Sequence, residues 1–300
     1  MLRVLVLILA LGLPAAQAQL SYSRGQTVAP AYEGWELNPD GSINLIFGYM
    51  NQNWEEELDV PVGPDNNISP GTADQGQPTH FLPRRNRFVF RVKVPKDFGE
   101  KEMVWSLTTR GKPIKAYATL KQDYFLDNMI FTSESGAIGA GVSSPAVRAN
   151  KPPAVKIDGD NTRTVKIGAP LTLSAWVTDD GIPKKHVVGD PFDRRTKGDL
   201  RMIPPRFITV DSATGLWVSL YPYRAAGTAK ISPEQPKPWE DTRAGANSQW
   251  APRWEPAAPP VDGKWTATAT FDEPGTYVLR WHASDGALWD DQEITVIVTR

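Results

Sequence analysis

The chain has 300 residues, which is long enough for two ordinary domains that each bury a hydrophobic core. Its 40% hydrophobic and 22% charged residues are typical of a globular protein, and its formal net charge of -1 argues against nucleic-acid binding, which requires a basic surface. The 27 prolines and 24 glycines favour many short strands joined by turns over long helices, so we predict an all-β protein.

The N-terminus has the pattern of a cleaved signal peptide. Arg3 supplies a positive charge, residues 4–13 form an apolar run too short to span a bilayer, and Ala16 and Ala18 form a small-x-small cleavage site. We therefore expect residues 1–18 to be removed and the protein to be exported to the periplasm or the cell exterior, without a transmembrane segment. The chain has no cysteine, which excludes disulfides and a lipid-modified cysteine and is common in bacterial envelope proteins.

Residues 19–132 are predicted to form an N-terminal β-sandwich. Apolar side chains recur at every second position over residues 88–94, which is the period of a strand with one face in a core. Residues 103–108 and 114–120 flank a short turn and predict a hairpin. Between the strands, residues 61–86 are rich in Pro, Asn and Gly and are expected to form one long irregular loop.

A Gly-, Ala- and Ser-rich stretch at 133–150 is predicted to link this half to a second β-sandwich at 151–300. The clearest strand of the second half lies within residues 274–286, where Tyr277, Leu279, Trp281 and Ala283 share one face and turn residues stand at both ends. The same two-residue period recurs over residues 171–177, 216–220, 265–271 and 294–298. The expected architecture is therefore two antiparallel β-sandwiches.

The segments LTLSAWVTDDGIP and PGTYVLRWHASDGALWDDQEITVIV of the second half carry a resemblance to a known fold. They are similar to the PKD-like and REJ-like immunoglobulin-type domains of secreted proteins. The resemblance implies an immunoglobulin-like sandwich, in which Tyr277 would be a corner tyrosine whose hydroxyl bonds nearby backbone. The first half resembles uncharacterised exported bacterial proteins, and that resemblance implies no chemistry.

Aspartates near the predicted strand ends suggest a metal site. Loops at one end of an immunoglobulin-type sandwich would bring these carboxylates together, and such oxygen ligands suit Ca²⁺. The alternative is that the aspartates serve their own turns by accepting hydrogen bonds from nearby backbone N–H groups. The candidate ligands are Asp179, Asp180, Asp285, Asp290 and Asp291.

Tryptophans of the second half are the candidate ligand-binding residues. Strand parity places Trp176 and Trp217 on outer faces, while others lie in a Pro-rich segment over residues 232–262. Exposed aromatic rings bind sugars or partner proteins, because large apolar area in water is unfavourable unless it is covered. The alternative is that the Pro-rich segment folds back and covers these rings as a small second core. The candidates are Trp176, Trp217, Trp239, Trp250 and Trp254.

Signatures of catalysis are weak. The chain has three histidines, far apart in sequence, and no nucleophile-elbow, phosphate-binding, zinc-protease or dinucleotide motif. The acidic run of residues 55–59 is the best candidate for a glycosidase carboxylate, with the 61–86 loop as its cleft. Neighbouring carboxylates in a strand point in alternate directions, however, and usually face solvent.

The sequence therefore predicts an exported, non-catalytic binding or structural module of the bacterial envelope, with a glycan or an envelope protein as partner. Two alternatives remain open. One is a polysaccharide-active enzyme or its accessory subunit, and the other is a spacer stiffened by Ca²⁺. Apart from Ca²⁺, no cofactor is expected.

Overall fold

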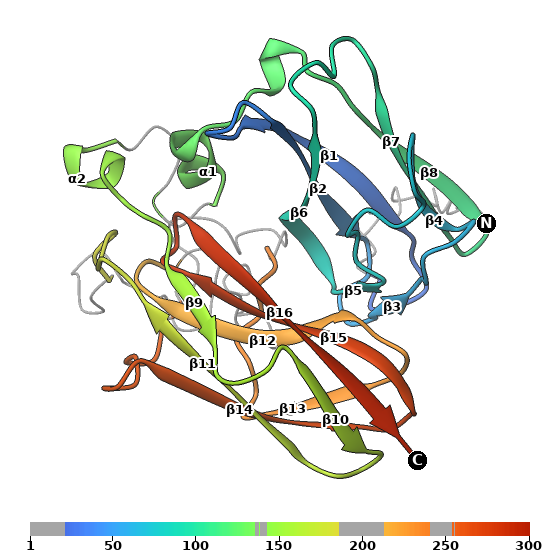
Figure 1. Cartoon of the computed structure of the whole chain (residues 1–300), viewed down its shortest axis with the longest axis vertical. Coiled ribbons are helices and arrows are strands. Elements are labelled where there is room, and N and C mark those ends of the chain that lie inside the picture. Colours follow the sequence, from blue (N-terminus) through green and yellow to red (C-terminus); the bar gives the residue numbers. More distant parts are fainter. Residues whose placement is uncertain (1–21, 136–137, 139–142, 186–212, 241–253, 255) are drawn as a thin grey trace, which may run out of the picture.

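The computed structural model describes residues 22–135, 138, 143–185, 213–240, 254 and 256–300 (Figure 1). The predicted signal peptide and Trp250 lie outside the described residues. No helix among the described residues is long and apolar enough to cross a membrane. The described chain consists mainly of strands in several sheets, which confirms the predicted all-β class.

The N-terminal half contains two small sheets that pack face to face. One sheet has the order β1-β2-β6 and the other the order β4-β7-β8, with β3 and β5 forming a two-stranded ribbon. Phe47 and Phe90 of the first sheet contact Trp105 of the second, and all three side chains are buried. The strands are β1 (Val28–Leu37), β2 (Ile43–Asn51), β3 (Leu58–Asp59), β4 (Asn66–Ser69), β5 (His80–Phe81), β6 (Arg84–Val94), β7 (Met103–Thr109) and β8 (Lys112–Ala118).

The prediction of one irregular loop over residues 61–86 is wrong, because β4 pairs there with β7, β5 pairs with β3, and β6 begins at Arg84. Buried Asn66 anchors the segment. Its side-chain amide donates to the carbonyls of Val60 and Pro78 and accepts a 2.9 Å hydrogen bond from Trp105 Nε1. Hydrogen bonds of the Asn66 side chain thus hold Val60, Pro78 and Trp105 together in addition to the backbone pairing of β4. The amino-acid composition of the segment does not show these bonds.

Short helices connect the halves: η1 (Gln122–Tyr124), α1 (Asn128–Glu134) and α2 (Pro145–Arg148). Asp127 caps α1 by accepting hydrogen bonds from the N–H groups of Met129 and Ile130. Helix α2 lies within residues 133–150, the segment expected to be a linker, and α1 ends at its start.

The C-terminal half is a sandwich of two four-stranded sheets, with the orders β10-β16-β15-β12 and β13-β14-β11-β9 (Figure 1). Its core lies between them and contains buried Leu173, Phe271 and Leu279. The strands are β9 (Ala154–Ile157), β10 (Thr162–Lys166), β11 (Leu171–Thr178), β12 (Trp217–Arg224), β13 (Ala229–Ser232), β14 (Lys264–Phe271), β15 (Gly275–Ser284) and β16 (Trp289–Thr299).

Two details of this half bear on the predictions. Tyr277 is fully buried and donates its hydroxyl to the carbonyl of Glu273 at 3.0 Å, which confirms the corner tyrosine. The pairing is not antiparallel throughout, because β10 runs parallel to β16. The C-terminal half begins with β9, at the edge of the β13-β14-β11-β9 sheet. The chain then crosses to the other sheet, where β10 forms the edge and runs parallel to its neighbour β16.

The two halves join on the outer face of β15 and β16. This face meets the middle of β6, where the strand departs from regular pairing: Phe47 pairs with Phe90 but Tyr49 pairs with Asn86. Three residues of β6 therefore stand opposite Gly48. Phe88, in the bulge, stacks on Trp289 of β16 at 5.4 Å between ring centroids and meets Phe131 of α1 edge-on at 5.0 Å.

Arg280 of β15 locks the junction electrostatically. Its side chain is on the outer face of the sheet yet is 5% exposed, because the N-terminal half covers it. Its guanidinium donates to the Val89 carbonyl at 2.5 Å and to Glu293 Oε1 at 2.5 Å, and it lies 3.5 Å from the ring centroid of Tyr223. A buried charge is tolerated only when it is fully paired in this way.

We predict that Arg280→Met destabilises the protein by about 1–3 kcal/mol, because the Val89 carbonyl loses its donor while the Glu293 carboxylate, which is 43% exposed, keeps its water. Lys93→Met is the matched control. It breaks the solvent-exposed pair with Asp40 and should leave the stability almost unchanged, because water and salt screen such a pair. Urea unfolding followed by tryptophan fluorescence measures both. Equal losses in the two variants would contradict the lock.

Candidate functional site: two cavities that share Trp217

The five candidate tryptophans do not share one surface. Trp176 is 37% exposed and carries Lys264 over its ring, whereas Trp217 and Trp239 are buried. Trp254 meets Trp217 edge-on at 6.4 Å between ring centroids. Trp254 of the Pro-rich segment thus lies against Trp217, and Trp250 is outside the described residues.

Trp217 and Trp254 are two walls of a cavity of about 520 Å³ at the β12 edge of the C-terminal sandwich. The other walls are Trp265 of β14 and Trp281 of β15, both assigned to the core by strand parity and neither recognised as site residues. We call this space the tryptophan cavity. Its volume is within the roughly 300–1,000 Å³ typical of small-molecule sites. The alternation of residues along a strand predicts which face a side chain points to, but not how far away the facing side chains lie. The sequence therefore gave no indication of this cavity.

The indole nitrogens of the cavity walls are unusual. Nε1 of Trp217, Trp265 and Trp281 is buried without a hydrogen-bond acceptor. A buried donor without a partner costs about 1–3 kcal/mol. The positions of these three rings therefore cost some stability. Trp105 differs, because its Nε1 donates a hydrogen bond to Asn66 Oδ1.

Residues 233–240, which we call the bridging segment, close one side of the cavity. Two hydrogen bonds hold it on β12: Ser219 Oγ donates to the Pro236 carbonyl at 2.7 Å, and Leu220 N donates to Gln235 Oε1 at 3.0 Å. Its far end bonds the other half, because Glu240 N donates to the Arg85 carbonyl at 2.8 Å. The bridging segment thus ties the cavity to the junction.

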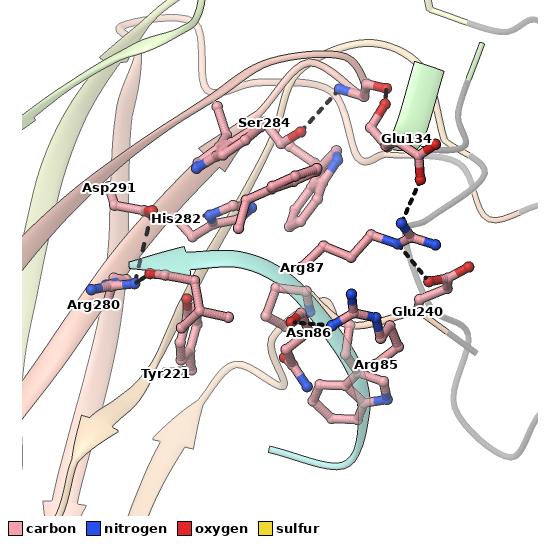
Figure 2. A pocket seen from close by; sticks show the side chains of 18 residues that line it. Arg85, Asn86, Arg87, Glu134, Tyr221, Glu240, Arg280, His282, Ser284 and Asp291 are labelled. Carbon is pink, nitrogen blue, oxygen red and sulfur yellow. Dashed lines mark hydrogen bonds and ion pairs between the residues drawn. The ribbon is translucent and has the colours of Figure 1, made fainter. Parts of the chain in front are cut away.

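A second, smaller cavity of about 120 Å³ lies at the junction itself, and Trp217 lines this one too. We call it the junction pocket (Figure 2). Arg87 of β6 extends between Glu134 and Glu240, with nitrogen–oxygen distances of 2.5 and 3.1 Å. Its pKa is raised because these glutamates outweigh the effect of burial. Arg87 is therefore a structural clamp between α1 and the bridging segment.

His282 of β15 faces the junction pocket beside Trp217, with 5.2 Å between their ring centroids. Its Nδ1 lies 2.7 Å from Asp291 Oδ1, within hydrogen-bond distance of that carboxylate. Burial disfavours the ionised form of Asp291, but His282 and Arg280 outweigh that effect and lower its pKa. Of the candidate metal ligands, Asp291 is thus committed to the junction.

The candidate metal ligands Asp179 and Asp180 serve a turn. Asp179 Oδ2 accepts a hydrogen bond from Gly181 N at 2.8 Å, and Asp180 Oδ1 accepts one from Ile182 N at 2.9 Å. These contacts are those of the turn interpretation. Asp180 also accepts from Lys151 N at 3.1 Å and so ties the turn to the entry of the second half.

Asp285 and Asp290 also bind backbone. Asp285 is fully buried and accepts from Ala287 N and Leu288 N at 2.6 and 2.7 Å. Burial raises the pKa of Asp285 to about 6, although these donors favour the ionised form. Asp290 accepts from Val155 N at 2.8 Å. Among the described residues no group of three or more His, Asp or Glu has an arrangement that could hold a metal ion, so the calcium site stays a prediction.

The acidic run forms ion pairs rather than an open carboxylate pair. Glu57 Oε2 and Asp59 Oδ1 lie 3.0 and 2.8 Å from the two ring nitrogens of His80, which is buried. Glu56 pairs with Arg110. Burial lowers the pKa of His80, but the bonds to Asp59 and Glu57 outweigh it and raise the pKa to about 9.

Comparisons with known proteins do not assign a family. No family model matches the chain, and no curated protein matches it in sequence. Similar solved structures include domains 4 and 5 of the S-layer protein SbsC (10% identity over 67% of this chain and 66% of that one, TM-score 0.23). The PKD domain of an M14-like peptidase from Thermoplasmatales archaeon SCGC AB-540-F20 is 15% identical over 49% of this chain and 98% of its own, with a TM-score of 0.21. The D00-D0 domain of Intimin is 11% identical over 91% and 100%, with a TM-score of 0.23. Similarity at this level carries no functional argument, and the architecture rests on the chain's own sheets.

The His80 cluster predicts a pH dependence of stability. Because the folded-state pKa of about 9 exceeds the ordinary 6.5, its contribution is complete below pH 6.5 and is lost as the pH rises through 9. The shift corresponds to about 3 kcal/mol. Denaturant unfolding at pH 6.5 and above should show this fall, and His80→Gln should remove it. A variant that retains the full fall would refute the assignment to His80.

The unsatisfied indole nitrogens predict a contrast between two buried tryptophans. Trp105→Phe leaves Asn66 Oδ1 without its donor, whereas Trp281→Phe removes a donor that has no acceptor. Both substitutions shrink the ring equally. We expect Trp105→Phe to lower the free energy of unfolding by about 1–3 kcal/mol more than Trp281→Phe. Denaturant unfolding measures the difference, and equal costs would contradict it.

Proposed function

We propose that this protein is an exported, non-catalytic binding module that holds a small ligand in the tryptophan cavity. The observation that carries the proposal is the cavity itself, with four indole rings around about 520 Å³. An open space of this size with apolar, aromatic walls and a few polar groups is the usual form of a small-molecule site.

The junction supports the proposal by making the cavity rigid. The bridging segment contacts β12 on one side and the N-terminal half on the other, through Glu240 N and through the Glu240–Arg87 pair. A wall that is already in place loses little conformational entropy when a ligand enters, which favours binding. The N-terminal half then acts as a brace for the site in the C-terminal half.

Export is part of the proposal and rests on the signal-peptide pattern of residues 1–18. The placement of the module in a bacterial envelope follows from that pattern together with the cysteine-free composition.

The two other functions receive less support. A polysaccharide-active enzyme would need a free acid and a free base, whereas Glu57 and Asp59 both bind His80. A calcium-stiffened spacer would need converging oxygen ligands, whereas Asp285 and Asp290 accept backbone hydrogen bonds. The junction is also stiffened without a metal, through Arg280.

We predict that at least one class of small soluble molecule raises the melting temperature, because a ligand bound only by the folded state stabilises it by mass action. The screen covers saccharides, amino acids, short peptides and aromatic acids. Trp254→Ala should abolish the shift because Trp254 lines the cavity.

The matched control is Trp176→Ala, which removes an exposed tryptophan of the same half that lines neither cavity. It should leave the shift intact. A shift that survives Trp254→Ala, or no shift from any class, would sink the proposed function.

A further inference from the structure

The chemistry of the tryptophan cavity walls narrows the ligand class, on the premise that the cavity is a binding site as proposed above. Four tryptophans line it: Trp254 and Trp265 are partly exposed, whereas Trp217 and Trp281 are buried behind them. The face of an aromatic ring is electronegative, so it attracts groups whose C–H bonds carry a slight positive charge. A pyranose ring presents such C–H groups on its faces and hydroxyl groups around its edge.

The charge of the cavity favours a neutral ligand. Among the residues that the structure describes, the charged lining residues are Glu234 and Lys237, one of each sign. Lys237 is itself drawn over the Trp239 ring, with Nζ 4.8 Å from the ring centroid. A carboxylate or phosphate ligand would meet no surplus of positive charge, and an ammonium ligand would meet no surplus of negative charge.

The polar groups of the lining suit hydroxyls, which both donate and accept hydrogen bonds. Thr266 and Glu234 are exposed residues that mark the mouth of the cavity. Glu234 brings acceptor oxygens and Lys237 brings donor N–H groups, and the Thr266 hydroxyl bonds Ser174 Oγ at 3.1 Å. Gln235 is already committed, because its amide bonds Leu220 N and the Pro233 carbonyl. The deep wall is therefore aromatic and the mouth is polar, which matches a ring that stacks inside while its hydroxyls face outward.

Other occupants fit less well. A lipid chain is best matched by aliphatic walls, whereas the described part of the lining has, besides prolines, Val218 and Ala257 as its aliphatic residues. A nucleotide needs a cluster of donors for its phosphates, which the Glu234 and Lys237 pair does not provide.

We infer that the tryptophan cavity binds a neutral saccharide, with a sugar ring stacked against the indoles of Trp254 and its neighbouring wall residues. The size of the cavity fits one or two sugar units and not a long chain enclosed along its whole length. A longer glycan would insert its terminal unit and leave the rest in solvent.

The test is calorimetric titration of the full-length protein with neutral mono- and disaccharides: glucose, galactose, mannose, xylose, N-acetylglucosamine, maltose and cellobiose. Matched arms use glucuronic acid, glucosamine and tryptophan as acidic, cationic and aromatic probes. We expect saturable binding of a neutral sugar, weaker binding of the charged sugar of the same ring, and no binding of tryptophan.

Trp254→Ala should weaken sugar binding by about tenfold or more, because it removes one stacking face. Trp254→Phe should retain part of the affinity, and Trp176→Ala all of it. Melting curves verify that each variant is folded.

The outcomes separate this inference from the proposed function. If another probe class binds in a Trp254-dependent manner while neutral sugars do not, the saccharide inference fails and the binding function stands. If no class in the titration or in the broader melting screen binds, both fail. Sugar binding that is unaffected by Trp254→Ala places the site elsewhere and overturns the inference.

Discussion

The arrangement of the two halves depends on one buried positive charge. Arg280 projects from the outer face of a sheet, where an arginine would ordinarily keep its guanidinium in water. Here the N-terminal half excludes that water, so the charge is stable only while the Val89 carbonyl and Glu293 are in place. The pairing is therefore conditional on docking. An undocked C-terminal half would regain solvent around Arg280, and a docked half with a misaligned β6 would leave the charge buried without its partner.

The Val89 carbonyl reaches Arg280 because β6 is locally distorted. Phe88 has a φ of 52°, in the left-handed region that bulky side chains rarely occupy, and the bulge lies opposite Gly48. A side chain at Gly48 would collide with the Asn86 carbonyl and with Glu33. The strain at Phe88 is offset by its packing between Trp289 and Phe131. The bulge of β6 thus combines an irregular backbone, aromatic packing and ion pairing. The same part of β6 contains Arg85 and Arg87, which bind Glu240 and so hold the bridging segment beside the tryptophan cavity.

The alternation of apolar and polar residues in the sequence predicted which side chains of a strand face the core. The inner face of the 274–286 strand and the corner hydroxyl of Tyr277 are as expected, because burying one face of a strand leaves a two-residue pattern. Periodicity did not predict that the outer face is covered, since Arg280 and His282 look like solvent-facing residues in a half-buried strand. It also did not predict the cavity: Trp265 and Trp281 point inward as parity requires, but the space beside them depends on where residues 233–237, Trp254 and Ala257 lie. The sequence similarly pointed to the aspartates as candidate ligands, but it did not show that backbone N–H groups of adjacent turns are their hydrogen-bond partners.

The parallel pairing of β10 with β16 affects how the C-terminal half responds to mechanical force. Tension applied at the start of β10 and at the end of β16 pulls on opposite ends of two strands that run in the same direction. All the backbone hydrogen bonds between Thr162–Lys166 and Thr295–Thr299 then resist together in shear, whereas an antiparallel hairpin such as β15–β16 would open one bond at a time from its free end. Tension that enters at β10 and leaves at the end of β16 therefore loads the whole pair at once, and these two strands separate late under such a force.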